Sequence, residues 1–387
     1  MNSKSINTES RLESTCRRLV TIPLFFLMTA LTLALLPALL AVALVVDLIR
    51  RRKWATVRVV AMLVVYFLFE SQGILVAFYV WAANGGPWGT ADQRWEDQHW
   101  AIQRWWGRNL FHFARKFFGF EITFEGEQEA DLGRGPIIVF PRHVSIADTF
   151  LPPIFVGAPH KLHLRYVLKR ELLWDPCLDL GGNRLPNYFV RRGSKKHGKN
   201  EVEEVASLAE NLGPKDGVII FPEGTRFSKK KRSHFLKKLA EAGDSVFLEK
   251  CRGFCNVMPP RLGGALALLQ RNRNADLLFI AHVGFERITT FKNLLNGALV
   301  GAKIKVRYWR VPFDSIPATR EECIDWLFER WSAIDQWVGE HLAPAALEPS
   351  VNSPLAEFPL FPRVPDSMIG RAGPRPPEPE SVSQPRR

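Results

Sequence analysis

Two long apolar runs stand out near the N-terminus of the chain. The first covers residues 19–46 and contains no charged residue, and the second covers residues 59–83. A helix needs about 20 consecutive apolar residues to cross the hydrocarbon core of a bilayer. We therefore predict a membrane-embedded helical region over residues 19–84, preceded by a polar N-terminus over residues 1–18. The first run is longer than the apolar core of a secretory signal, so we expect it to remain in the mature protein.

Several residues bear on whether these apolar runs cross the membrane or fold back within it. Pro37 lies where an interior proline bends or breaks a helix, so a helical hairpin dipping into one leaflet competes with a straight span. Glu70 is costly at mid-depth in lipid, so either it faces protein or water, or the chain folds back there. Arg17 and Arg18 precede the first run, and a basic cluster at 50–58 separates the two. By the positive-inside rule, this charge pattern favours a first segment that re-enters on the same side, with the domain that follows the membrane-embedded region in the cytoplasm.

A third region, residues 85–124, mixes aromatic rings with cations. Its aromatic residues are Trp88, Trp95, Trp100, Trp105, Trp106, Phe111, Phe113, Phe117 and Phe118, and its cations are Arg94, Arg104, Arg108, Arg115 and Lys116. Such a mixture is typical of an interfacial helix, because rings settle at headgroup depth and cations meet lipid phosphates. An ordinary amphipathic helix that covers a core is the alternative.

After residue 124, short apolar runs alternate with helical patterns. Strands are predicted at residues 137–140, 188–190, 218–221, 277–283 and 303–308, and helices at 199–211 and 320–341. The alternation predicts an α/β domain with a central mixed sheet flanked by helices over residues 125–342. Eleven of the 27 prolines fall after Ala343, so we predict that residues 343–387 form a disordered or extended tail.

Charge and cysteine content limit the classes of partner. Lys plus Arg number 52 against 39 Asp plus Glu, which gives a formal charge of +13. This favours an anionic partner, such as nucleic acid, a membrane surface or a phosphate-bearing substrate. The five cysteines do not suggest a disulfide framework, and Cys251 and Cys255 have no second pair at metal-ligand spacing. We therefore expect a reducing compartment and no metal site.

A histidine and an aspartate follow the predicted strand at 137–140. His143 and Asp148 are five residues apart, or about 140° apart around an ideal helix, so they meet only if one lies in the turn that leads into a helix. A strand, turn and helix would supply that geometry. Asp148 could then hold one imidazole nitrogen of His143 while the other accepts a proton from a substrate hydroxyl, which is general-base activation.

Two further strand ends carry polar groups. The strand at 218–221 runs into Pro222-Glu223-Gly224-Thr225-Arg226, and the strand at 188–190 runs into Arg191-Arg192. Guanidinium groups are suited to binding phosphate. Because strand ends in an α/β sheet converge on one crevice, His143, Arg192, Glu223 and Arg226 could share a site.

Taken together, these motifs resemble those of the glycerol-phosphate and lysophosphatidic acid acyltransferase superfamily. Its first block is matched by His143 to Asp148, its second by Phe189-Val190-Arg191-Arg192, and its third by Phe221-Pro-Glu-Gly-Thr-Arg226. A fourth block, Val257-Met-Pro-Pro-Arg261-Leu-Gly263, has the form found in the branch that contains lysocardiolipin acyltransferase-like enzymes. Arg142 departs from the family, which usually has Asn before the histidine.

The resemblance implies an O-acyltransferase of phospholipid biosynthesis or remodelling. It would move a fatty acyl group from acyl-CoA or acyl-carrier protein to the free hydroxyl of a lysophospholipid, with 1-acylglycerol-3-phosphate as the expected acceptor, and would need no cofactor. His143 would be the general base and Asp148 its orienting partner. The implied substrate-binding residues are Arg192, Glu223, Gly224, Thr225, Arg226, Pro259 and Arg261.

Other classes of protein are less well supported. The chain has no G-x-S-x-G nucleophile elbow and no G-x-x-x-x-G-K-[ST] phosphate loop, which argues against a serine hydrolase and a P-loop enzyme. The basic runs at 194–199 and 228–232 suit loops near anionic lipid or coenzyme A phosphates, so we expect membrane lipids and no nucleic acid as partners. A non-catalytic membrane lipid-binding protein remains the alternative function.

Overall fold

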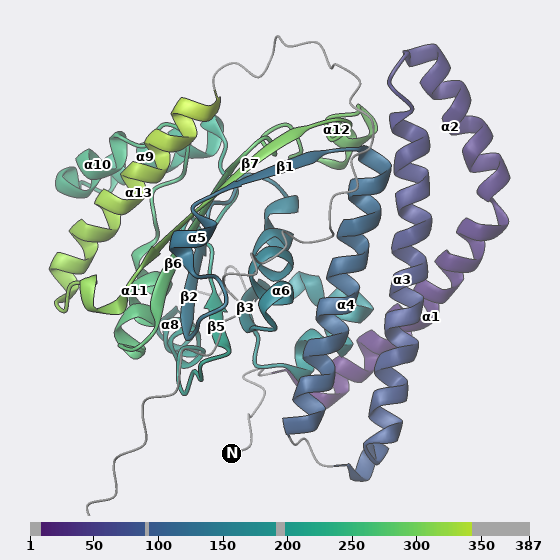
Figure 1. Cartoon of the computed structure of the whole chain (residues 1–387), viewed down its shortest axis with the longest axis horizontal. Coiled ribbons are helices and arrows are strands. Elements are labelled where there is room, and N and C mark those ends of the chain that lie inside the picture. The colour runs from purple at the N-terminus through teal and green to yellow at the C-terminus, as the bar shows by residue number, and fades with distance from the viewer. Residues whose placement is uncertain (1–8, 90–92, 191–197, 343–387) are drawn as a thin grey trace, which may run out of the picture. The chain divides into compact units, whose positions relative to one another are not determined.

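A computed structural model describes residues 9–89, 93–190 and 198–342 of the chain. Within these residues, seven strands form one sheet in the order β1-β7-β6-β2-β5-β3-β4 (Figure 1). All neighbouring pairs are parallel except β6 and β7, which are antiparallel. The strands are β1 (Glu121–Glu125), β2 (Ile137–Pro141), β3 (His163–Lys169), β4 (Tyr188–Val190), β5 (Asp216–Ile219), β6 (Asp276–Val283) and β7 (Lys303–Val311). The mixed sheet predicted from the sequence is confirmed.

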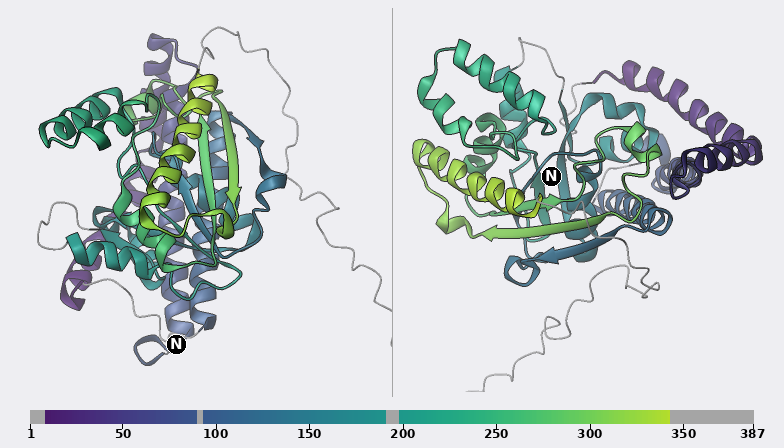
Figure 2. Two further views of the ribbon diagram at one scale, coloured as in Figure 1. Left: turned by 90° about the vertical axis from the view of Figure 1, so that its left-hand side faces the viewer. Right: turned by 90° about the horizontal axis from the view of Figure 1, so that it is seen from above.

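Helices pack on both faces of this sheet, as two perpendicular views show (Figure 2). The helices are α1 (Arg11–Ala34), α2 (Leu36–Arg50), α3 (Ala55–Ala83), α4 (Gln93–Phe118), α5 (Glu127–Ala130), α6 (Ala158–His160), α7 (Pro176–Leu180), α8 (Gly198–Ser207), α9 (Lys229–Glu241), α10 (Ser245–Arg252), α11 (Leu262–Arg271), α12 (Phe291–Leu295) and α13 (Arg320–Leu342). Short 3₁₀ and π turns lie between them, among them a 3₁₀ turn at Ala147–Phe150.

The central strand β2 is buried on both sides because its side chains alternate between two apolar clusters. Ile138 and Phe140 pack with residues of α8, α11 and α13 on one face. Ile137 and Val139 pack on the other face, in a cluster that also contains Phe118 of α4. A strand covered on both faces needs a continuous apolar sequence, which explains why β2 could be predicted from its composition.

The first apolar run forms two helices. Helix α1 ends at Ala34, Leu35 lies between the helices, and α2 begins at Leu36 with Pro37 in its first turn. Proline is tolerated in a first turn because its missing N–H would have no partner there, so the expected break at Pro37 is confirmed. Helices α1 and α3 are long and apolar enough to cross a membrane, by length and composition.

Helix α3 continues through Glu70, whose side chain is fully buried against protein. Its Oε1 atom accepts a hydrogen bond from Trp106 Nε1 of α4 at 3.0 Å, and Oε2 accepts one from the main-chain N–H of Cys177 of α7 at 3.3 Å. Of the alternatives for Glu70, the structure has the one in which it faces protein.

The aromatic residues of α4 are largely packed against neighbouring elements. The Trp105 ring contacts Phe69 of α3 with centroids 5.3 Å apart, and Trp100 stacks on His163 of β3 at 5.2 Å. Trp88, just before α4, is by contrast 90% exposed. These contacts support the core-covering alternative for the helix, and its position at a membrane interface stays a prediction.

Several boundaries differ from the predicted ones. Strands β1 and β3 were not predicted, since both alternate polar with apolar residues and have only half-buried faces. The helix expected at 199–211 is α8 and ends at Ser207, and the strand expected at 218–221 is β5, which begins at Asp216. Arg192 and the predicted tail at 343–387 lie outside the described residues.

Candidate active site

The neighbouring parallel strands β2 and β5 bring two motifs to the same edge of the sheet. These are the first motif, His143 to Asp148, and the third, Phe221 to Arg226. The two strands run in register from Ile137 opposite Gly217 to Val139 opposite Ile219, so the segments that follow them leave side by side. The main-chain N–H of Phe227, just after the third motif, donates to the carbonyl of His143 at 2.7 Å. The convergence predicted for these strand ends is thus present for residues 142–148 and 220–227.

His143 and Asp148 are in direct contact. The Nδ1 atom of His143 lies 3.1 Å from Oδ2 of Asp148. The same oxygen accepts the main-chain N–H groups of Val144 and Ser145, the latter at 2.7 Å. Asp148 sits in the 3₁₀ turn at Ala147–Phe150, and its carboxylate closes the turn back onto the end of β2. This local closure is how a five-residue spacing brings the two side chains together.

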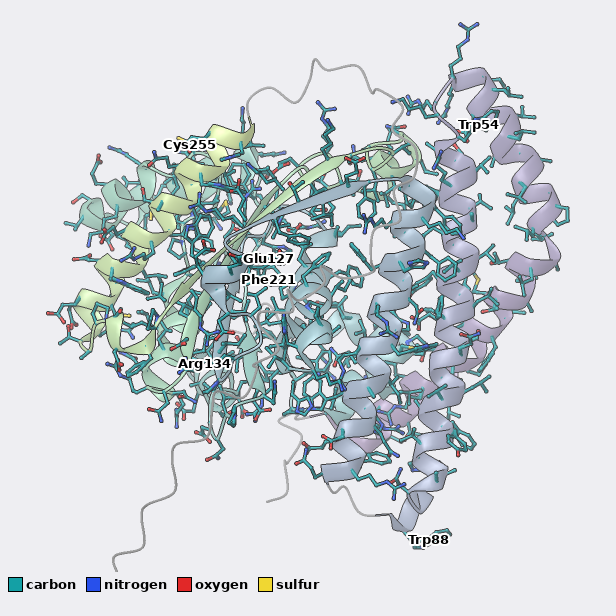
Figure 3. The ribbon with its side chains drawn as sticks, in the orientation of Figure 1. Trp54, Trp88, Glu127, Arg134, Phe221 and Cys255 are labelled. Atoms are coloured by element: carbon teal, nitrogen blue, oxygen red, sulfur yellow. The ribbon has the colours of Figure 1, made fainter. Side chains whose placement is uncertain are left out.

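The outer nitrogen of His143 is accessible. Its ring packs against the ring of Phe221 (labelled in Figure 3), with centroids 4.4 Å apart, and its side chain is 15% exposed while that of Asp148 is fully buried. Among the described residues, Nε2 of His143 has no hydrogen-bond partner. With Nδ1 directed to the carboxylate, Nε2 is the nitrogen available to take up a proton.

Glu223 holds the main chain of the site together. Its Oε1 atom accepts the N–H of His143, and Oε2 accepts the N–H of Met258 at 2.8 Å. Burial raises the pKa of this carboxyl to about 8, and the bonds from Met258 and His143 act in the opposite direction. The described contacts of Glu223 are therefore to backbone, and its predicted contact with substrate stays a prediction.

Gly224 occupies a position that only glycine fits. Its φ of +62° is in the left-handed region, and a Cβ there would lie 2.6 Å from Cδ of Arg261. The main-chain N–H of Arg261 in turn donates to the carbonyl of Pro222 at 2.8 Å. The fourth motif is therefore fixed directly against the third. Pro259 is buried and Arg261 is exposed.

Basic side chains surround the exposed part of the third motif. Arg226 donates through Nη1 to the carbonyl of Thr289 at 3.0 Å, and Lys231 Nζ lies 3.2 Å from Oγ1 of Thr225 and 3.0 Å from the carbonyl of Arg226. Arg226 is partly exposed and Lys231 is exposed. The structure thus brings together His143, Asp148, Glu223, Gly224, Thr225, Arg226, Pro259 and Arg261 of the predicted site, and Arg192 lies outside the described residues.

Two buried residues beside the dyad were missed as site residues by sequence reasoning. His282 of β6 lies with Nε2 3.3 Å from Oδ1 of Asp148. Arg142 is fully buried and donates to the carbonyl of His282 at 2.5 Å and to Oε1 of Glu286 at 2.6 Å. The signal that could have found His282 is a histidine within an otherwise apolar strand. Among the described residues, no group of three or more His, Cys, Asp or Glu side chains could hold a metal ion.

Comparisons with known proteins agree with this geometry. The family model described as Acyltransferase matches residues 121–249, which include the dyad and the third motif. This match supports the resemblance to the glycerol-phosphate acyltransferase superfamily. A curated relative of this chain is 1-acyl-sn-glycerol-3-phosphate acyltransferase epsilon of Mus musculus, 22% identical over 240 residues, which covers 59% of this chain and 63% of the relative. The chain thus spans less than two thirds of that relative's length.

A solved structure is also similar to this chain. It is the crystal structure of the 1-acyl-sn-glycerophosphate (LPA) acyltransferase PlsC from Thermotoga maritima, with 16% sequence identity and a TM-score of 0.43. The match covers 72% of this chain and 95% of that one.

Proposed function

We propose that this acyltransferase moves a fatty acyl group from an acyl thioester to the free hydroxyl of a lysophospholipid, with 1-acylglycerol-3-phosphate as the acceptor. The donor is acyl-CoA or acyl-carrier protein. The observation that carries the proposal is the His143–Asp148 pair, at 3.1 Å, with the outer nitrogen of His143 open. The name of the curated relative supports the choice of acceptor.

The dyad can perform the reaction without a covalent enzyme intermediate. His143 Nε2 takes the proton from the acceptor hydroxyl as the oxygen attacks the thioester carbonyl carbon. The carbon–sulfur bond then breaks, and the departing thiolate takes the same proton from the imidazolium. Asp148 holds Nδ1–H throughout and stabilises the imidazolium that forms between the two steps. Acyl group, proton and electrons are balanced without a further reactant.

Cations beside the dyad are suited to the acceptor phosphate. Arg226 and Arg261 are both accessible and belong to motifs that meet at Gly224. A guanidinium forms two parallel hydrogen bonds to phosphate, so a phosphate held by either side chain would place the glycerol hydroxyl toward His143. Arg192 is proposed to add a third guanidinium to the same headgroup.

Membrane association fits a lipid acceptor. Helices α1 and α3 are apolar enough to cross a membrane, and α1 and α2 expose a series of large apolar side chains. These are Leu19, Val20, Leu24, Leu27, Met28, Leu31, Leu33, Leu40, Val42, Leu44, Val45, Leu48 and Ile49. We propose that this surface is buried in lipid and that the acyltransferase domain faces the cytoplasm.

The test is direct transfer by the purified full chain in detergent. Labelled acyl-CoA and acyl-carrier protein are each incubated with lysophospholipids that differ in headgroup, with His143→Ala as the matched control. We expect a labelled diacyl product from 1-acylglycerol-3-phosphate that is lost in the variant. Transfer only to acceptors without a phosphomonoester would overturn the proposal that 1-acylglycerol-3-phosphate is the acceptor. Lysophospholipid binding without transfer by any donor would favour the non-catalytic lipid-binding alternative.

A further inference from the structure

Asp148 lies between two histidines. Its Oδ2 atom is 3.1 Å from His143 Nδ1, and its Oδ1 atom is 3.3 Å from His282 Nε2. The second contact is longer and less well aligned than an ideal hydrogen bond. Within the described part of the chain, Oδ1 of Asp148 and both ring nitrogens of His282 are buried without a formal hydrogen bond, so this contact is the nearest polar pairing that Oδ1 and Nε2 have. His282 comes from β6, which pairs directly with β2.

The location of His282 is unfavourable for a residue that serves packing alone. Its side chain is fully buried, as is that of Asp148. Burying a polar ring without partners costs free energy that an apolar side chain of similar size would not cost. The neighbouring strand residues of β6 are apolar, which makes an apolar residue easy to accommodate at this position. The contact with Asp148 is the interaction in the structure that offsets this cost.

Burial leaves the ring of His282 neutral near pH 7. Burial lowers the pKa of His282, and the Arg142 guanidinium lowers it further, while the carboxylates of Asp148 and Glu286 act in the opposite direction. These groups come from the end of β2, the 3₁₀ turn and the loop after β6. The Phe285 ring, 5.4 Å from His282 between centroids, adds no charge.

The carboxylate also selects the tautomer. A neutral imidazole carries one proton, on either Nδ1 or Nε2. With the proton on Nε2, the ring donates toward Oδ1 of Asp148. With the proton on Nδ1, two lone pairs would face each other at 3.3 Å, and a buried N–H would have no acceptor. The Nε2–H tautomer is therefore favoured.

We propose that His282 is a positioning residue that donates Nε2–H to Asp148 and so fixes the carboxylate for His143. The inference rests on the proposed function, because it assigns His282 a part in the same reaction. His282 does not touch substrate and moves no proton. By fixing Oδ1 of Asp148, it holds the other carboxylate oxygen, Oδ2, in place for Nδ1 of His143.

Arg142 places His282 in turn. Its guanidinium donates to the carbonyl of His282, and its main-chain N–H donates to the carbonyl of Ile280 at 2.8 Å. Glu286 accepts from the same guanidinium nitrogen, Nη1, at 2.6 Å and also accepts the N–H of Gly284 at 2.7 Å. Arg142 contacts His282, His282 contacts Asp148, and Asp148 contacts His143. Because Arg142 directly precedes His143 in the sequence, this series of contacts returns to its starting point. The ring position of His282 is therefore coupled to the end of β2.

Three variants of the full chain test the proposal. His282→Leu removes the donor, and His282→Gln retains a side-chain N–H that can reach the place of Nε2. The matched control is His99→Leu, since His99 of α4 is equally buried but contacts Trp95 and Arg184 instead of the dyad. Each is assayed for kcat, for KM of both substrates and for Tm.

We expect His282→Leu to lower kcat by about 10- to 100-fold, the range for losing one hydrogen bond to a charged group. Both KM values should stay near wild type, because His282 does not touch either substrate. His282→Gln should recover most of kcat, and His99→Leu should change Tm at unchanged kcat. A His282→Leu variant with wild-type kcat would overturn the proposal. So would a folded His282→Gln variant as impaired as His282→Leu.

A measurement without turnover separates this inference from the proposed function. In protein labelled with ¹⁵N-histidine, the signals absent from His282→Gln identify the His282 ring. At pH 7 we expect a neutral ring protonated on Nε2. A charged ring, or one protonated on Nδ1, overturns the inference even if the enzyme is active. The expected tautomer in a chain that transfers no acyl group would overturn the proposed function instead.

Discussion

Replacing Asp148 with Asn isolates the effect of one negative charge in the site. The carboxylate oxygen Oδ2 accepts from His143 Nδ1, Val144 N and Ser145 N, and an Asn oxygen at the same place accepts from the same three donors. The amide nitrogen would then face His282, whose ring can accept after changing its tautomer. The fold should therefore persist, and the imidazolium that forms on His143 during the reaction should lose its charged partner.

The expected loss follows from the strength of that one contact. A hydrogen bond to a charged group contributes about 1.5–3 kcal/mol, which corresponds to about a 10- to 150-fold decrease in kcat. The assay compares kcat for labelled acyl transfer at saturating donor and acceptor, with Tm measured on the same preparation.

The matched control is Asp47→Asn. Asp47 is a buried aspartate that accepts the main-chain N–H groups of Thr56 and Val57, each at 3.0 Å, at the start of α3. This variant also removes a charge from a buried carboxylate, and it should lower Tm at unchanged kcat. An Asp148→Asn enzyme that folds and retains kcat within about threefold of wild type would refute the role of Asp148.

Three other changes have defined outcomes. His143→Ala should lower transfer by about 100- to 10,000-fold, the usual worth of a general base, with Tm and membrane insertion retained; near-normal turnover would exclude His143 as the base. Arg226→Ala should raise KM for the acceptor far more than KM for the donor, whereas Arg252→Ala, which removes an exposed arginine paired with Glu249, should change neither; equal effects on both substrates would assign Arg226 to donor binding. Burial raises the pKa of Glu223 from 4.5 to about 8. Between these two values the folded state holds a proton that the unfolded state has released. The contribution of this group to the free energy of unfolding should therefore fall as the pH rises from about 4.5 to about 8. Glu223→Gln should flatten that part of the stability profile measured by urea unfolding, and an unchanged slope would contradict the assignment.

The dyad and the third motif could be predicted because both depend on short stretches of sequence. His143 and Asp148 are joined by one turn, and the apolar runs of β2 and β5 are recognisable on composition. Parallel strands in an α/β sheet bring their ends to one edge, which is sufficient to place Glu223 near His143. The side-chain role of Glu223 was beyond sequence reasoning, since the motif does not reveal that its oxygens accept main-chain N–H groups.

The second histidine depends on the order of strands. Asp148 and His282 meet only because β6 pairs with β2, although β3, β4 and β5 come between them in the sequence. No pattern within β6 specifies its neighbours. A histidine in an apolar strand indicates a polar partner somewhere, but the partner is identified only once the sheet order is known.

The N-terminal helices are joined to the acyltransferase domain by polar contacts as well as apolar ones. Tyr66 of α3 donates to Oδ2 of Asp175 at 2.8 Å, close to Glu70, and Arg184 donates to the carbonyl of Ala77 at 3.2 Å. These contacts follow one side of α3 over several turns. Hydropathy treats a helix as uniform around its axis, so it could not show that one side of α3 packs against a protein domain.

The same contacts bear on the membrane position of the chain. Near the N-terminal end of α1, Arg17 and Arg18 both pair with the buried carboxylate of Asp179, at 2.9 and 3.0 Å. If α1 and α3 crossed the bilayer as a straight pair, α7 and these charges would be carried toward the hydrocarbon at high cost. A region that enters one leaflet through the exposed apolar side chains of α1 and α2 avoids that cost and keeps Asp179 at the polar side. On this argument we propose the re-entrant path for the first segment, and its topology stays a prediction.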